Sequence, residues 1–203
     1  MIKAVFFDIG NVLLRFNAAD ILREVSEEIR RHPLRVAKYL WSSRIGERIE
    51  LGQVSGRQLY ALFRKELEYA GAYDRFRRLW CDHFTLERRS AALLKRVART
   101  HKVYLLSNTN RLHYEFIRKR YAFARHAHGA ILSYRLRLRK PDPAIYRAAL
   151  KTARVRPEEA VFIDDLPENV EAARRLGLHA LQFRGAPELR LQLARLGVLP
   201  RGR

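Results

Sequence analysis

The sequence predicts an α/β fold built on a doubly wound parallel sheet. Short apolar runs of strand length recur along the chain, and stretches with helical spacing separate them, as is typical of a parallel sheet covered by helices. The chain has 203 residues, 48% of them hydrophobic, which is ordinary for one globular core and excludes disorder over most of its length. The runs expected to form strands are 2–7, 103–106, 130–132, 160–163 and 179–183.

Several helices are expected from their end signals. Asp142 and Pro143 are typical of an N-cap and a first helical position, and they precede a helix over 144–153. Gly177 is expected to end a helix that follows Pro167. These helices fall between expected strands, as the crossover connections of a parallel sheet require.

A helical insertion is expected after the first strand. Residues 8–102 separate the first two strands, whereas a simple crossover needs about a dozen residues or more. Asn17 can cap a first helix and Pro33 can begin a second, while Ser-Gly-Arg-Gln at 55–58 is a capping box for a third. We expect these helices to form a small lid over the carboxyl ends of the strands.

Polar side chains follow three of the expected strands. The first strand ends at Asp8, the second at Ser107 and Asn108, and the fourth at Asp164 and Asp165. In open α/β sheets, ligands bind beyond the carboxyl ends of the strands. We therefore expect these side chains to lie together in one crevice.

This set of residues is suited to phosphoryl transfer. Paired carboxylates repel one another unless a cation lies among them, and oxygen ligands suit Mg²⁺. One carboxylate can attack phosphorus while the metal and the Lys140 ammonium neutralise the phosphate oxygens, and a hydroxyl with backbone N–H groups holds the phosphate. Each residue alone has an ordinary explanation as a turn residue, a helix cap or a surface charge, but their shared position at strand ends favours the catalytic interpretation.

Five motifs occur in order along nearly the whole chain: Phe-Asp-Ile-Gly-Asn-Val at 7–12, Glu-Leu-Gly-Gln-Val-Ser at 50–55, Leu-Ser-Asn-Thr-Asn-Arg-Leu-His at 106–113, Arg-Lys-Pro at 139–141 and Phe-Ile-Asp-Asp-Leu-Pro-Glu-Asn at 162–169. With them the sequence resembles phosphatases of the haloacid dehalogenase superfamily, which have a Rossmann-like core. Within that superfamily it resembles the branch that contains bacterial α-glucose-1-phosphate phosphatase and the phosphatase domain of soluble epoxide hydrolase. The resemblance implies a Mg²⁺-dependent phosphatase that hydrolyses a small phosphorylated metabolite, a sugar phosphate being favoured, through an aspartyl-phosphate.

The resemblance also implies residue roles. Asp8 would be the nucleophile, and Asp8, the main-chain carbonyl of Gly10 and Asp164 would hold Mg²⁺. Ser107 and the backbone of Asn108 would bind phosphate.

The remaining implied roles support these groups. Lys140 would steady the nucleophile and the transferring group, and Asp165 would act on the metal through water or pair with Lys140. Asn11 is a supporting residue that could position water or a proton, and Asn169 would orient its loop.

The motif spacing locates the cap of this family. Lys140 follows Ser107 by 33 positions, which leaves no room for a second inserted domain. We therefore expect a helical cap over 17–84 and an α/β core formed by 1–16 and 85–203. In the family this cap closes over the substrate and selects it, so substrate contact is expected, with lid packing and solvated charge as the alternative, from Trp41, Arg44, Arg48 and Glu50.

Gly10 departs from the family pattern, since most of its phosphatases have a second Asp there as general acid and base. General acid–base catalysis is typically worth ~10²–10⁴-fold, so unactivated alkyl phosphates should be poor substrates. Three explanations stay open: an easier leaving group such as an anomeric sugar phosphate, which we favour; replacement by Asn11, His113 or a cap residue; or a slow relative retained for binding. Metal-free dehalogenases also lack this Asp, but they do not keep the Asp164–Asp165 pair, so a 2-haloacid dehalogenase is disfavoured.

The charge of the chain suggests acidic partners without choosing one. There are 41 Lys and Arg against 21 Asp and Glu, a formal net charge of +20. Arg makes up 33 of the 41, so codon bias is the plainer cause, and the alternative is a catalytically weak protein that binds acidic partners through its Arg-rich surface. Nucleic acid, if bound, should bind weakly and without sequence preference.

The single cysteine and the N-terminal sequence bear on location. Cys81 cannot form an intrachain disulfide, and the short apolar run before Asp8 has neither the length of a membrane span nor a signal-peptide layout. We expect a soluble cytoplasmic protein, monomeric or homodimeric, that has no membrane partner.

Overall fold

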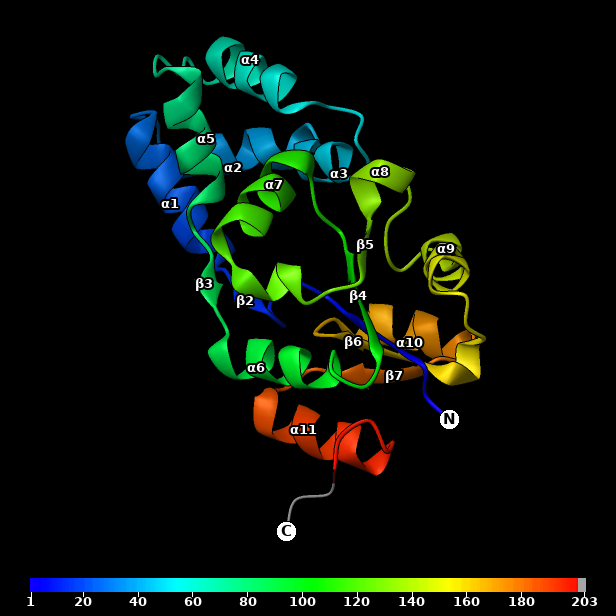
Figure 1. Ribbon diagram of the computed structural model, residues 1–203. Helices are drawn as coiled ribbons and strands as arrows, with labels where there is room; N and C mark the ends of the chain where they lie inside the picture. Colours follow the sequence, from blue (N-terminus) through cyan, green and yellow to red (C-terminus); the bar gives the residue numbers. More distant parts are fainter. Residues whose placement is uncertain (201–203) are drawn as a thin grey trace.

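The computed structural model describes residues 1–200 and has a five-stranded parallel sheet at its centre (Figure 1). The strand order is β5-β4-β1-β6-β7, so the chain crosses over on both sides of β1. This confirms the predicted doubly wound α/β fold. The strands are β1 (Ala4–Phe7), β4 (Lys102–Ser107), β5 (Gly129–Leu132), β6 (Ala160–Asp164) and β7 (His179–Gln182).

Helices cover both faces of this sheet. One face packs against α6, α7 and α11 through alternating residues such as Val5 and Phe7, and the other packs against α9 and α10 through Ala4 and Phe6. Asp142 accepts a hydrogen bond from the Ala144 N–H at the start of α9, as its position before Pro143 predicts. The core helices are α6 (Arg88–Val97), α7 (Arg111–Arg120), α8 (Ser133–Leu136), α9 (Pro143–Ala153), α10 (Pro167–Arg175) and α11 (Ala186–Arg195), with 3₁₀ turns at Ala122–Arg125 and Pro157–Glu159.

Five further helices lie in the chain between β1 and β4, and we call residues 18–81 the α1–α5 unit. They have a hydrophobic cluster of their own, in which Phe63 and Phe76 are fully buried. Asn17 caps the first helix, Pro33 begins the second, and Ser55 with Gln58 forms the expected capping box. The helices are α1 (Ala18–Glu28), α2 (Pro33–Ser42), α3 (Ile45–Glu50), α4 (Gly56–Glu66) and α5 (Tyr73–Cys81).

A two-stranded antiparallel ribbon flanks the α1–α5 unit at its two junctions with the core. It pairs β2 (Leu14–Arg15) with β3 (Thr85–Leu86), so the chain leaves and re-enters the core at adjacent positions. The sequence did not predict this ribbon, because two-residue strands leave no periodic pattern.

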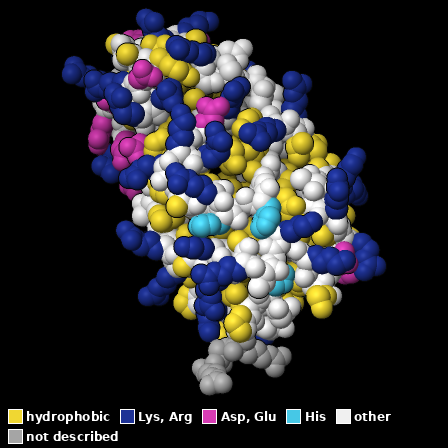
Figure 2. Space-filling model, viewed as in Figure 1, with side chains coloured by type: hydrophobic (Ala, Val, Ile, Leu, Met, Phe, Trp, Pro, Cys, Tyr) yellow, Lys and Arg dark blue, Asp and Glu magenta, His cyan; other side chains and the backbone are white. Residues whose placement is uncertain are grey.

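Basic side chains are distributed over the surface. In Figure 2, Lys and Arg are scattered over all parts of the visible face, whereas Asp and Glu gather mainly over the upper part of the molecule. Within residues 1–200, no helix combines the length and the apolar character needed to cross a membrane.

Candidate active site

Three carboxylates meet at the carboxyl edge of the main sheet. Asp8 follows β1, Asp164 ends β6, and Asp165 is the next residue. One carboxylate oxygen from each lies within 4.8 Å of the others. β1 and β6 pair in parallel with Phe7 opposite Ile163, so the register brings Asp8 and Asp164 to the same edge.

Lys140 is the buried cation of this cluster. Its Nζ lies 2.5 Å from Asp164 Oδ2 and 3.0 Å from Asp8 Oδ2, and it also donates to the Leu106 carbonyl at 3.1 Å. Lys140 is 2% exposed and Asp164 is fully buried, so water screens these charges little. Burial disfavours the ammonium, but attraction by Asp8 and Asp164 outweighs this and raises the pKa of Lys140. The side chain is therefore charged at neutral pH.

The Asp8 carboxylate is strongly desolvated. Burial raises the pKa of Asp8 to about 7; Lys140 opposes this rise, Asp164 adds to it, and a hydrogen bond with Ser107 lowers it. Asp8 Oδ1 accepts the Ile9 N–H at 2.7 Å, while Oδ2 faces Lys140. A cation among the three carboxylates would favour the ionised form of Asp8.

Two asparagines orient the other carboxylates. Asn169 donates to Asp164 Oδ1 at 2.9 Å, and Asn11 donates to Asp165 Oδ2 at 3.2 Å. Burial raises the pKa of Asp165, and the Asn11 hydrogen bond opposes that rise. Of the two roles expected for Asp165, pairing with Lys140 is not seen in the described chain, because the Lys140 ammonium is taken by Asp8 and Asp164.

Ser107 and Asn108 end β4 beside the same cluster. Asn108 donates through Nδ2 to the Lys140 carbonyl at 2.9 Å and accepts the Lys140 N–H through Oδ1 at 2.8 Å. The amide therefore fixes the loop of Lys140, and both of its ends are occupied. Ser107 is 2% exposed and lies within hydrogen-bonding reach of Asp8. The fold thus brings together the eight side chains predicted for the site: Asp8, Asn11, Ser107, Asn108, Lys140, Asp164, Asp165 and Asn169.

Gly10 faces an aromatic ring. An added Cβ at Gly10 would lie 3.1 Å from Cε1 of Phe16, which is tighter than an ordinary van der Waals contact. Phe16 is 40% exposed and packs edge-on against Phe84, with ring centroids 6.1 Å apart. The position at which an acid is expected in most phosphatases of the resembling superfamily therefore has a phenyl ring beside it in this chain.

A cavity of about 190 Å³ lies beside Ser107 and Asn108, between the α1–α5 unit and the core. The Trp80 and His113 rings stack with centroids 5.8 Å apart, and His113 Nε2 is 2.8 Å from the Trp80 carbonyl. Five rings line the cavity, and we call them the aromatic wall: Phe16, Trp80, His83, Phe84 and His113.

Both imidazoles of the aromatic wall are neutral at pH 7. Desolvation lowers the pKa of His113 to about 3, with a further contribution from His83, and desolvation lowers the pKa of His83 to about 4. Since the Trp80 carbonyl can only accept, neutral His113 carries its proton on Nε2. The Nδ1 atom of His113 is then an acceptor.

Of the four residues expected to contact substrate from the cap, Glu50 alone lines this cavity. Its Oε2 lies 3.0 Å from Nη2 of Arg139, the residue before Lys140. Trp41 is 87% exposed on α2, and the lining of the cavity includes neither it nor Arg44 or Arg48. Most of the aromatic wall was not predicted from the sequence; its signal was the run Trp-Cys-Asp-His-Phe at 80–84, where the chain returns to the core.

The donor set fits Mg²⁺. Asp8, Asp164 and Asp165 supply hard oxygen ligands close together, and Lys140 offsets only one of the three negative charges. A divalent cation would balance the remainder, and carboxylate oxygens are the ligands that Mg²⁺ prefers. In this chain the three carboxylates are the residues suited to hold the metal.

Comparisons with known proteins agree with this geometry. A family model described as haloacid dehalogenase-like hydrolase matches residues 2–177. D-ribitol-5-phosphate phosphatase of Bacteroides thetaiotaomicron is 26% identical over 205 residues, covering 95% of this chain and 97% of its own.

Two solved structures share the fold. A haloacid dehalogenase family enzyme of Bacteroides thetaiotaomicron, crystallised with magnesium and inorganic phosphate, has a TM-score of 0.75 at 22% identity, covering 91% of this chain and 96% of its own. A 2-haloacid dehalogenase of Pseudomonas syringae has a TM-score of 0.70 at 20% identity, covering 97% of this chain and 100% of its own.

Proposed function

Because the chain belongs to the haloacid dehalogenase-like hydrolases, we propose that it is a Mg²⁺-dependent phosphatase, a phosphoric monoester hydrolase of small phosphorylated metabolites. The observation that supports this best is the buried cluster of Asp8, Asp164, Asp165 and Lys140. Its excess negative charge favours a metal and a phosphate ester over metal-free dehalogenation. The relative that matches over nearly the full chain is a D-ribitol-5-phosphate phosphatase, and its name supports the same class of reaction.

The proposed reaction has two displacements at phosphorus. Asp8 Oδ2 attacks the phosphorus atom, the bond to the leaving oxygen breaks, and the leaving group takes a proton from water. A water oxygen then attacks the aspartyl-phosphate, the bond to Asp8 breaks, and inorganic phosphate is released as the water proton passes to solvent.

The remaining groups neutralise charge and position the phosphate group. Mg²⁺, held by Asp8, Asp164 and the Gly10 carbonyl with Asp165 acting through water, would neutralise the phosphoryl oxygens. The Lys140 ammonium stabilises negative charge next to Asp8. Ser107 and the backbone N–H of Asn108 bind the phosphate oxygens.

The substrate class we propose is a sugar or polyol phosphate. The cavity beside Ser107 is small and combines the aromatic wall with polar groups such as Glu50, which suits a compact ligand that has both apolar and hydroxyl surfaces. A relative that acts on D-ribitol 5-phosphate is consistent with this class. We further propose that the α1–α5 unit, within boundaries 17–84, is the cap that selects this ligand.

Phosphate release from a chromogenic ester tests the proposal. Wild-type protein should release phosphate with Mg²⁺ and stop when a chelator is added, and Asp8→Asn should be inactive while retaining its fold. Asp74→Asn, at an exposed aspartate of α5, is the matched control and should retain activity. Equal, slow release by wild type and Asp8→Asn would favour the alternative of a catalytically weak protein.

A further inference from the structure

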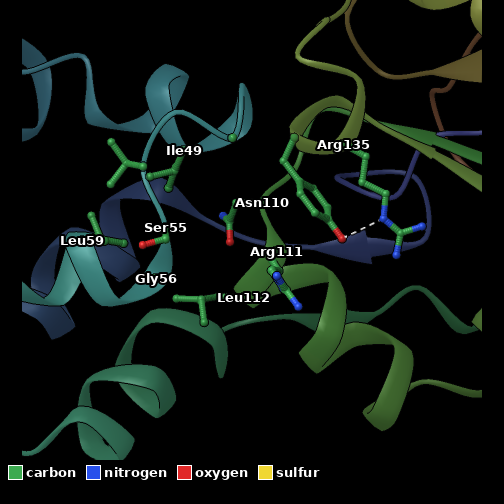
Figure 3. A pocket seen from close by; sticks show the side chains of 11 residues that line it. Ile49, Ser55, Gly56, Leu59, Asn110, Arg111, Leu112 and Arg135 are labelled. Carbon is green, nitrogen blue, oxygen red and sulfur yellow. Dashed lines mark hydrogen bonds between the residues drawn. The ribbon is translucent and has the colours of Figure 1, made fainter.

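A second cavity lies where the α1–α5 unit meets the core, and we call it the seam cavity (Figure 3). Its volume is about 290 Å³, and its walls come from the segment that joins α3 to α4 on one side and from α7 and α8 on the other. Ile49 and Asn110 line both this cavity and the one beside Ser107, so they form the partition between the two. Its lining includes none of the carboxylates of the cluster, nor Ser107 or Lys140, so the seam cavity lies outside the proposed catalytic site.

Close contacts between the two units border the seam cavity. Gly52 has a φ of +66°, and its Cα side approaches the Tyr134 carbonyl so closely that a Cβ could not be accommodated. At Gly56, an added Cβ would lie 2.8 Å from the Leu112 side chain. A ligand between these contacts would touch both units at once.

The seam cavity has an apolar end and a cationic end. Figure 3 shows Leu59 at one end and Arg135 at the other, with Leu112 and Arg111 between them, Arg111 on the side of Arg135. Leu59 is 1% exposed, so the apolar end belongs to the packed interior. Cavities of about 150 Å³ lined by apolar side chains accept benzene, so this space is large enough for a ring with a short chain.

The Arg135 guanidinium is positioned by aromatic side chains and is available to bind an anion. Its guanidinium lies 5.6 Å from the Tyr114 ring centroid and 5.7 Å from that of Tyr134, and its Nε donates to Tyr134 Oη at 3.2 Å. These aromatic contacts position the Arg135 guanidinium. Within residues 1–200, no carboxylate forms an ion pair with it. Arg111 bonds Glu115 at 2.8 Å and keeps further N–H donors. Two such guanidiniums favour a carboxylate or phosphate group.

We propose that the seam cavity binds a small amphipathic anion, an aryl or alkyl carboxylate or phosphate. Its apolar part contacts Leu59 and Leu112, and its anionic group lies between Arg111 and Arg135. Because the ligand contacts both units, binding stabilises their packing and raises the unfolding temperature. This site does not depend on the proposed phosphatase activity.

Binding of 3-phenylpropionate, measured by calorimetry on the full chain with Mg²⁺, tests the proposal. We expect a Kd on the order of 0.1–1 mM, typical of a ligand of about ten non-hydrogen atoms, and much weaker binding of neutral 3-phenylpropanamide. Comparison with 2-phenylethylphosphonate tells which anionic group is preferred. Loss of binding in Ser107→Ala, at a residue that lines the cavity beside the cluster and not the seam cavity, would place the probe at the catalytic site and overturn the proposal.

Variants locate the site. Arg111→Gln and Arg135→Gln should each weaken binding about 2- to 5-fold, as expected for solvent-exposed ion pairs. Arg125→Gln, at an exposed arginine outside the cavity, is the matched control and should change nothing. Val54→Phe should fill the cavity and abolish binding with the circular dichroism spectrum retained. No saturable binding up to about 10 mM, or equal weakening by Arg125→Gln, would refute the site.

Discussion

Placing a carboxyl group at position 10 should accelerate the cleavage of phosphate esters that have poor leaving groups. In the proposed reaction no side chain at Gly10 protonates the leaving oxygen, so the rate of the first displacement should fall steeply as the leaving-group pKa rises. Gly10→Asp supplies an acid next to Asp8. The gain should be large for alkyl phosphates and small for 4-nitrophenyl phosphate, whose leaving group needs no proton.

The structure sets the size of this gain. The added Cβ would lie 3.1 Å from Phe16 Cε1, so the ring has to move by a few tenths of an ångström. Phe16 is 40% exposed and makes one edge-on contact with Phe84, and Gly10 does not have the positive φ that would oppose a side chain. We therefore expect a gain at the lower end of the roughly 10²–10⁴-fold that general acid–base catalysis supplies, and a larger one in Gly10→Asp/Phe16→Ala.

The assay is the dependence of kcat/KM on leaving-group pKa, because kcat/KM reports the first displacement. Gly10→Asn fills the same space without an ionisable acid and is the matched control, and Phe16→Ala alone corrects for the lost ring. The slope should flatten in Gly10→Asp and stay steep in Gly10→Asn. A slope that is already flat in the wild type, or the same gain for all esters in both variants, would refute the reasoning.

Two other perturbations test the electrostatics of the site. Lys140→Met leaves Asp8 and Asp164 buried without their cation, so the free energy of unfolding, measured in the presence of a chelator, should fall by roughly 3–5 kcal/mol. Lys151 is exposed, so Lys151→Met is the control and should have little effect. Equal urea midpoints for the two variants would contradict the prediction. His113 has a folded-state pKa of about 3 against an ordinary 6.5, so the unfolded state binds the proton first and stability is lost as pH falls from about 6.5 towards 3. Between pH 6.5 and 4.5 this amounts to roughly 2–3 kcal/mol, and His113→Asn should show a shallower pH dependence in urea unfolding than the wild type.

The core of the fold and the predicted cluster follow from local patterns in the sequence. Apolar runs fix the strands to within two residues, because a buried parallel strand is apolar on both faces. The polar residues that follow those runs are then brought together by register, as Phe7 opposite Ile163 does for Asp8 and Asp164. Neither step requires knowledge of distant packing.

The cavity beside Ser107 depends on how the α1–α5 unit packs against the core, and no local pattern specifies that packing. Trp80 and His83 have the helical spacing of ordinary core residues, and the sequence does not show that they lie opposite Ser107. Trp41 was expected to contact substrate, yet it is 87% exposed because it lies on the outer side of α2. Nor does any local pattern in the sequence show that the Phe16 ring lies beside Gly10.

The net charge of +20 and the buried Lys140 should act on different kinetic constants. Exposed Lys and Arg side chains spread over the surface act on an anionic substrate at long range, and salt screens them, since the Debye length falls from about 10 Å at 0.1 M to about 3 Å at 1 M. Lys140 is 2% exposed and lies 3.0 Å from Asp8, so salt should leave its effect largely unchanged. Raising the ionic strength should therefore lower kcat/KM for a phosphate dianion while kcat stays nearly constant; a parallel fall in both would mean that the surface charge also acts on the chemical step.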